Sequence, residues 1–186
     1  DCDATEVRAV PETQPSPQSS WLLLGGLLAL AGAARLIGLR ESPGWYHDET
    51  IYIGEAWNFI HGRFVWDTVQ HTFLPRLPLF HLLTGPMLVL FGKDILWVRL
   101  IAALSGVAIT AVIWRLGREA HGRAAGLIGG FLFAVSTYAV LLTRWGMSYA
   151  LDAALGAANL LALVVFARTR SRASLIWAVA RPRWGC

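Results

Sequence analysis

Long apolar stretches separated by short charged connectors run along the 186-residue chain. An α-helix needs about 20 mostly apolar residues to cross the hydrocarbon core of a bilayer, because it rises about 1.5 Å per residue. Four stretches have about this length and carry at most one charged side chain each: residues 21–39, 96–114, 124–142 and 149–167. The pattern therefore predicts an all-α, polytopic membrane protein with about four transmembrane helices.

The connection at residues 40–95 is long and mostly polar, and it predicts a first outer loop that contains interfacial helices. Within it, residues 48–61 have a helical periodicity that places Tyr52, Ala56 and Phe59 on one apolar stripe. We therefore expect a helix here that packs through this stripe and does not cross the membrane.

The apolar segment at residues 79–91 decides the topology. It has only 13 residues and is interrupted by Gly85-Pro86, so we interpret it as an interfacial or re-entrant helix. The alternative is a short true span, which would reverse the orientation of every later loop.

Composition supports a membrane protein. Hydrophobic residues make up 55% of the chain and charged residues 15%, whereas soluble domains have about 25% charged residues. These figures argue against a water-soluble globular domain and exclude a disordered chain. Cys2 and Cys186 lie at the extreme ends, which excludes an internal disulfide framework. The basic residues are scattered between apolar segments, so we expect no nucleic-acid partner.

The amino-terminal 20 residues are polar and rich in Pro, Ser and Gln, which predicts a disordered tail at residues 1–20. A signal peptide is the competing interpretation of residues 21–39. We prefer a transmembrane helix, because the preceding tail is acidic and lacks the basic region with which a signal peptide opens.

Charge asymmetry predicts the orientation in the membrane. The connectors at residues 115–123 and 168–172 carry three arginines each, and short basic loops lie on the cytoplasmic side. Residues 40–95 carry four basic and six acidic residues, which fits the outer face. Four spans then place the amino terminus in the cytoplasm, provided that residues 79–91 do not cross.

The adjacent acids Asp48 and Glu49 lie beside aromatic residues in the outer loop. Carboxylates at a membrane surface could supply a general base or bind a cation. The alternative is a structural role, with Asp48 as the N-cap of the helix and Glu49 in its first turn. The two roles are compatible.

Asp152 lies near the outer end of the fourth predicted span. An acid at membrane depth is costly, which makes it a candidate functional residue. The alternative is an acid that caps the helix or pairs with Arg144. If Asp152 and Asp48 face one cavity, they would form an acid/base or metal-binding pair.

Basic side chains near the outer face are candidates for phosphate binding. Arg76 lies in a Pro-rich turn, Leu74-Pro75-Arg76-Leu77-Pro78, and Arg144 follows the third predicted span. The alternative for both is interfacial snorkelling, which is also our interpretation of Arg35 and Arg99. The loop histidines lack the spacing of a zinc site and are interpreted as solvated or interfacial: His47, His61, His71 and His81.

Several of these features occur in an order that resembles a known superfamily. A first span ends in Arg-Leu-Ile-Gly-Leu and is followed by Asp-Glu, the step Pro-Arg-Leu-Pro-Leu-Phe-His, and Val-Arg-Leu-Ile-Ala-Ala-Leu-Ser-Gly. A basic turn and Arg-Trp-Gly-Met-Ser-Tyr-Ala-Leu-Asp complete the series. This order resembles the amino-terminal membrane module of GT-C glycosyltransferases, such as the protein O-mannosyltransferases, the aminoarabinose transferases of lipid A and the bacterial RgtA/B/C/D-like transferases.

The resemblance implies a function and a set of site residues. Enzymes of this kind transfer a sugar from a polyprenyl-phosphate carrier to a lipid, glycan or protein acceptor, on the outer face of the plasma membrane in bacteria. Asp48 matches their catalytic acid, Glu49 completes the pair, and Asp152 matches their second acid. Arg76 matches the basic residue that binds the donor phosphate, with Arg144 and His71 as further candidates.

The chain also departs from the family pattern. Pro75 stands where the aminoarabinose branch has a metal-binding acid, so no cofactor is required, although a divalent cation is compatible with the remaining acids. The histidine of the His-Pro-Pro form is absent, and His71 lies upstream. Family members are longer, so we expect an amino-terminal fragment with a GT-C-like module at residues 21–180 and a tail outside the family pattern at residues 181–186.

Two other classes of protein compete with a transferase. A membrane scaffold or assembly subunit could keep the fold without activity. A small transporter or channel could line its path with the outer acids, but transporters place ionisable residues near mid-membrane and often have an internal repeat. Here the acids lie near one face and the sequence has no evident repeat, which favours the transferase.

Overall fold

The computed structural model describes residues 17–63 and 78–169, and the regular structure of these ranges is entirely helical. This confirms the predicted all-α fold class. The seven helices in these ranges are α1 (Pro17–Leu36), α2 (His47–Ile60), α3 (Pro78–Phe91), α4 (Ile95–His121), α5 (Arg123–Val135), α6 (Thr137–Arg144) and α7 (Tyr149–Thr169). The predicted disordered tail is too long, because residues 17–20 already belong to α1. The rest of that tail and the tail at residues 181–186 lie outside the described residues.

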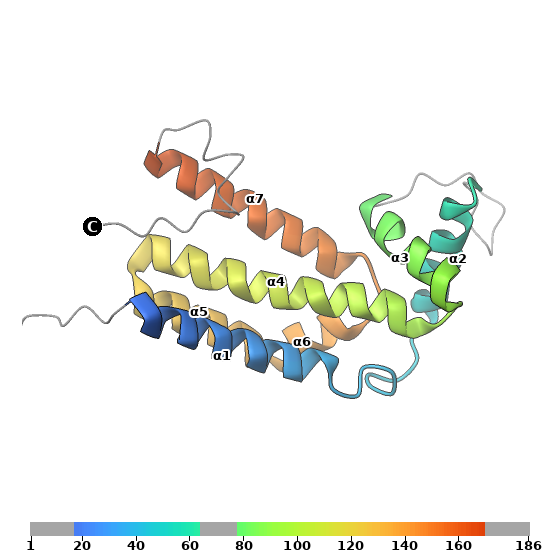
Figure 1. The fold of residues 1–186 in the computed structure, drawn as a ribbon, viewed down its shortest axis with the longest axis horizontal. Coiled ribbons are helices and arrows are strands. Elements are labelled where there is room, and N and C mark those ends of the chain that lie inside the picture. Colours follow the sequence, from blue (N-terminus) through green and yellow to red (C-terminus); the bar gives the residue numbers. More distant parts are fainter. Residues whose placement is uncertain (1–16, 64–77, 170–186) are drawn as a thin grey trace, which may run out of the picture.

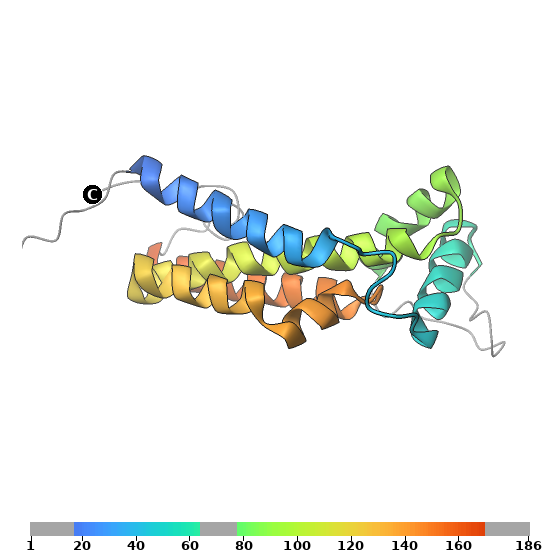
Figure 2. The same cartoon turned by 90° about the horizontal axis from the view of Figure 1, so that it is seen from below.

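The molecule consists of a long bundle with a small helical layer at one end (Figure 1). Helices α1, α4, α5 and α7 run along the bundle, and the long α4 contacts α1, α5, α6 and α7. Helices α2 and α3 pack on each other at one end of the bundle, a separation that the turned view also shows (Figure 2). The chain therefore reaches this end through α1, leaves through α4, returns through α5 and α6, and leaves again through α7.

Within residues 17–63 and 78–169, α4 and α7 are long and apolar enough to cross a membrane. The pair α5–α6 would be a third span if its two bent halves act together, and α1 is a shorter apolar helix over Ser20–Leu36. Two or three of the four predicted spans thus meet the usual length in the described residues. The 14-residue α3 lies in the end layer and does not run along the bundle, as expected of a helix that does not cross (Figure 1).

Two segments differ in shape from what the sequence pattern suggests. The segment at residues 124–142 is not one straight helix, because α5 and α6 are bent by 61° at a break between Val135 and Thr137. The basic connector at residues 115–123 is mostly helical, because α4 continues to His121. An i,i+4 ion pair stabilises this extension, with 2.7 Å between Arg115 Nε and Glu119 Oε1.

Small residues allow α4 and α5 to approach closely, as the Gly-rich start of α5 suggests. A Cβ atom on Gly126 would lie 2.4 Å from the Trp114 carbonyl oxygen. The contact at Gly126 is with backbone, so this glycine is needed for the close approach, whereas a Cβ on Gly130 would meet Cδ2 of Leu27 on α1 at 2.7 Å, the mobile end of a side chain. Trp114 and Leu27 belong to the apolar core that joins α1, α4 and α5.

In the end layer, α2 and α3 pack through the predicted stripe. Tyr52 and Ala56 are buried, which confirms this face of the helix. We predicted that Gly85-Pro86 interrupts this segment. This prediction was wrong, because α3 continues through Pro86. Gly85 allows α3 to lie close to α2, because a Cβ there would be only 3.1 Å from the Ala56 carbonyl oxygen.

His81 is buried in the same layer, contrary to the expectation of a solvated or interfacial side chain. It lies between α3 and α2, where its Nε2 is 3.5 Å from Glu55 Oε2 and its ring stacks on Tyr52. Burial lowers the pKa of His81 to about 4. The neutral imidazole therefore serves as a packing residue of the end layer at physiological pH. The exposed rings of His47 and His61 agree with the prediction.

Candidate active site

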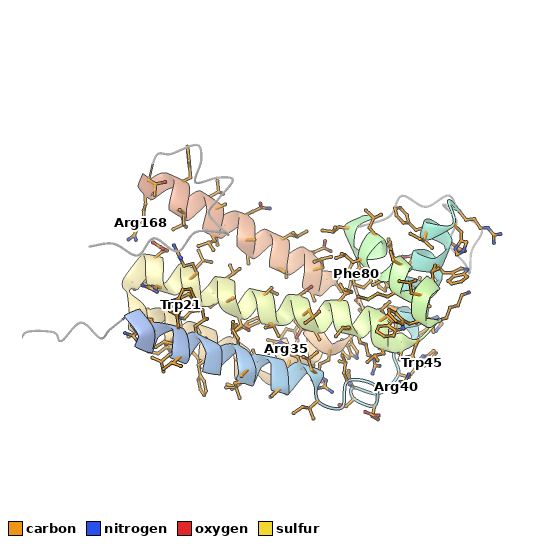
Figure 3. All side chains as sticks on the ribbon, viewed as in Figure 1. Trp21, Arg35, Arg40, Trp45, Phe80 and Arg168 are labelled. Atoms are coloured by element: carbon orange, nitrogen blue, oxygen red, sulfur yellow. The ribbon has the colours of Figure 1, made fainter. Side chains whose placement is uncertain are left out.

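Three segments meet where the bundle joins the end layer: the start of α2, the start of α4 and the chain leading into α7. An apolar cluster joins them and includes Tyr52, Val98, Ile101, Met147 and Leu151. Side chains from these segments fill the junction (Figure 3). This is the end of the molecule that contains both predicted acids.

A buried ion pair lies at the centre of the junction. The guanidinium of Arg99, on α4, donates to both oxygens of Glu49, on α2, with Nε–Oε1 at 2.8 Å and Nη2–Oε2 at 2.7 Å. Glu49 is 0% exposed and Arg99 1% exposed. A bidentate pair of this kind fixes the orientation of both side chains, so it sets the position of α2 against α4.

The remaining contacts of Glu49 connect two further segments. The backbone N–H of Tyr46 donates to Oε2 at 3.2 Å, and the N–H of Gly146 donates to Oε1 at 2.8 Å. The Glu49 carboxylate thus joins the start of α2, α4 and the segment before α7. Glu49 is not directed at a solvent-accessible site, and its contacts make it a residue that positions its neighbours.

Asp48 differs from Glu49 in its surroundings. The N-cap residue of α2 is Tyr46, so the structure corrects the interpretation of Asp48 as the cap and makes it the second residue of the helix. Successive helical residues point about 100° apart, which turns Asp48 away from the Arg99 pair. It is half-buried, and no side chain in the described part of the chain pairs with its carboxylate.

Asp152 lies in the first turn of α7 and is exposed. Its Oδ2 is 3.5 Å from Ser148 Oγ, and Ser148 Oγ is in turn 3.5 Å from Tyr52 Oη on α2. The start of α7 is therefore connected to α2 twice, through Ser148–Tyr52 and through Gly146–Glu49. These connections place the chain segments of Asp48 and Asp152 at one end of the fold.

Arg144 does not pair with Asp152. Its guanidinium donates to the backbone carbonyls of Ala34, Ile37, Gly38 and Ser42, at 2.7–2.9 Å, and so holds the turn between α1 and α2. Arg99 similarly reaches the carbonyls of Leu39, Arg40 and Gly44.

The snorkelling interpretation of Arg35 and Arg99 was wrong, because both are fully buried. Sequence reasoning missed their partners, which are carbonyls and a carboxylate distant along the chain. The other predicted phosphate-binding residues, Arg76 and His71, lie outside the described residues.

Aromatic rings border the start of α2. Tyr46 stacks on Trp145, with ring centroids 5.1 Å apart and an angle of 27° between the planes. Trp45 is 67% exposed beside them, and Figure 3 shows it at the same end of the fold. No group of three or more metal-binding side chains occurs in residues 17–63 and 78–169. The junction thus contains carboxylates, which can act in acid–base catalysis, and aromatic faces, which can stack on a ring-shaped substrate.

These features define an all-helical membrane protein that presents two acids at one end of its bundle. Residues 74–185 match the family model described as dolichyl-phosphate-mannose-protein mannosyltransferase. The match covers more than half of the chain, so the chain belongs to this family of membrane glycosyltransferases. It includes Arg99, Arg144 and Asp152 but not Asp48 and Glu49. Neither the curated proteins nor the solved structures gave a match to the chain.

Proposed function

We propose that this protein transfers a sugar from a polyprenyl-phosphate-linked donor to a hydroxyl group of a lipid, glycan or protein, on the outer face of the membrane. The observation that carries the proposal is the double connection between the starts of α2 and α7, through Glu49–Gly146 and Tyr52–Ser148. It puts two acids at one end of a chain that belongs to a glycosyltransferase family.

The proposed reaction assigns a role to each acid. The acceptor oxygen attacks the anomeric carbon of the donor sugar, and the bond from that carbon to the phosphate oxygen breaks, with inversion. Asp48 takes the proton of the acceptor hydroxyl, as a general base. Asp152 orients the acceptor or the sugar, and Glu49 holds the first turn of α2 in place. Arg76, with His71 nearby in sequence, offsets the charge that the lipid phosphate gains.

The proposal is tested by measuring the rate of sugar transfer by the whole chain in proteoliposomes. The donor is a radiolabelled polyprenyl-phosphate sugar, and the acceptor is a lipid. We expect Asp152→Asn to lower the rate about 10- to 100-fold, because a hydrogen bond to a charged group is worth about 1.5–3 kcal/mol. The matched control is Glu119→Gln, since Glu119 pairs with Arg115 and Arg168 at the far end of α4. Equal rates for the two variants would contradict the role of Asp152.

The proposed sidedness predicts a labelling pattern. Cys2 and Cys186 are first replaced, and a single cysteine is then introduced at either Glu41 or Ala120. Both positions are exposed, and they lie at opposite ends of the bundle. In intact cells a membrane-impermeant maleimide should label the cysteine at residue 41 and not the one at residue 120, because basic loops stay in the cytoplasm. Permeabilised cells should give labelling at both positions. The reverse pattern in intact cells would place the two acids in the cytoplasm.

A further inference from the structure

The break between α5 and α6 removes backbone hydrogen bonds in the middle of an apolar region. In a continuous helix the carbonyls of Phe133 and Ala134 would accept from the N–H groups of Thr137 and Tyr138, four residues on. The 61° bend separates these partners. A carbonyl that is buried without a donor costs free energy, so the break needs donors from another element.

Arg35 of α1 supplies these donors. Its Nη2 donates to the Phe133 carbonyl and its Nη1 to the Ala134 carbonyl, both at 3.2 Å. Its Nε donates to Thr143 Oγ1 at 3.0 Å, on the other side of the break. The side chain is 0% exposed, and the guanidinium lies over the Phe133 ring. One guanidinium therefore holds the end of α5 and the body of α6 at a fixed angle.

A glycine on α4 makes room for this arrangement. A Cβ atom on Gly106 would lie 2.5 Å from Arg35 Nε and 2.7 Å from Thr143 Cβ. Both distances are too short for real contacts, so either the guanidinium or α6 would have to move. The bend thus depends on α1, α4, α5 and α6 together.

The angle of α6 decides where the following residues lie. Arg144, the last residue of α6, donates to the carbonyls of the α1–α2 turn, and Gly146, two residues later, donates its N–H to Glu49. We propose that Arg35 is a positioning residue, which sets the bend so that α6 delivers Gly146 and Ser148 to the start of α2 beside the two acids. Its relevance to sugar transfer rests on the proposed function, whereas its effect on the bend does not.

Spin-label distances in the whole chain, reconstituted in vesicles, test the bend directly. One label pair joins Ile37, after α1, to Leu142 on α6, and a reference pair joins Leu104 on α4 to Ile128 on α5. All four residues are exposed. Leu142 lies six residues beyond Ser136, so straightening α6 would move it by up to about 9 Å.

Two substitutions weaken the Arg35 contacts in different ways. Arg35→Leu removes the donors, and Gly106→Ala displaces the guanidinium while keeping its charge. Gly26→Ala is the matched control, because a Cβ on Gly26 meets nothing within 4 Å. We expect both test variants to shift or broaden the distance between labels 37 and 142 and to leave the reference pair unchanged. If Arg35→Leu does not fold, Gly106→Ala alone decides.

The outcomes separate this inference from the proposed function. If the distance between labels 37 and 142 is unchanged in Gly106→Ala, the inference that Arg35 sets the bend is overturned. The same holds if Gly106→Ala lowers the melting temperature but leaves this distance unchanged. A shift accompanied by a lower kcat at unchanged donor KM supports the positioning role, and a shift with normal transfer would overturn that role. A complete enzyme that transfers no sugar would refute the proposed function, while the shift would still establish the effect of Arg35 on the bend.

Discussion

The Asp48→Asn variant is expected to transfer sugar about 10²–10⁴-fold more slowly than the wild type, the usual cost of losing a general base. Asparagine keeps the size of the side chain but cannot accept the proton of the acceptor hydroxyl. The fold should be unaffected, because no side chain in the described part of the chain pairs with the Asp48 carboxylate and the N-cap of α2 is Tyr46. The measurement is initial rate at saturating donor, in proteoliposomes with matched protein content.

Glu41→Gln is the matched control for Asp48→Asn. Glu41 is an exposed carboxylate in the connection that leads into α2, so this variant removes one negative charge from the same end of the molecule without touching the proposed base. We expect its transfer rate to stay within about twofold of the wild type, since exposed charges contribute little. Near-normal transfer by Asp48→Asn would refute the assignment of the base.

The sequence predicted the helices well where periodicity or length was decisive. The long apolar runs became α4 and α7, and the stripe that includes Tyr52 and Ala56 became the buried face of α2. Apolar burial depends on local spacing, which a single sequence displays directly. The placement of the acids at one end follows from the same reasoning, because it depends only on how often the chain crosses the bundle.

The break at Ser136 had no comparable signal. The segment at residues 124–142 contains no proline and no charge, so local propensity favours one continuous helix. The bend is stabilised by Arg35, which lies about 100 residues earlier in the chain. A tertiary contact of this kind overrides local preference, and its only trace in the sequence is a charged residue within an apolar run.

The roles of the arginines were hidden for a related reason. A snorkelling arginine and a buried one have the same apolar neighbours in sequence, and only the partner distinguishes them. For Arg144 the partners are backbone carbonyls of a turn, which no side-chain pattern reveals. For Arg99 one partner, Glu49, was visible, but as half of an acidic pair assigned to catalysis. A buried Arg99 needs a counter-charge, but the sequence alone does not show that Arg99 is buried.

The strongest effect on stability is expected at this buried pair. Arg99→Met leaves the Glu49 carboxylate 0% exposed and without its counter-charge, and breaking a buried ion pair on one side costs about 3–5 kcal/mol. The loss includes the donors to the carbonyls of Leu39, Arg40 and Gly44. We expect a large fall in the melting temperature of the purified protein in detergent, measured from the loss of the helical circular dichroism signal on heating.

A second substitution in the Arg99→Met background identifies the cause of the loss. Adding Glu49→Leu removes the stranded charge, so stability should recover in part. Recovery should be incomplete, because the three carbonyls still lack their donors and Gly146 loses its acceptor. The control is Arg40→Met, since Arg40 pairs with Asp94 at the same end but is exposed, and exposed pairs contribute about 0–1 kcal/mol. If Arg99→Met costs no more than Arg40→Met, the Glu49–Arg99 pair does not hold α2 on the bundle, and the positioning role of Glu49 fails with it.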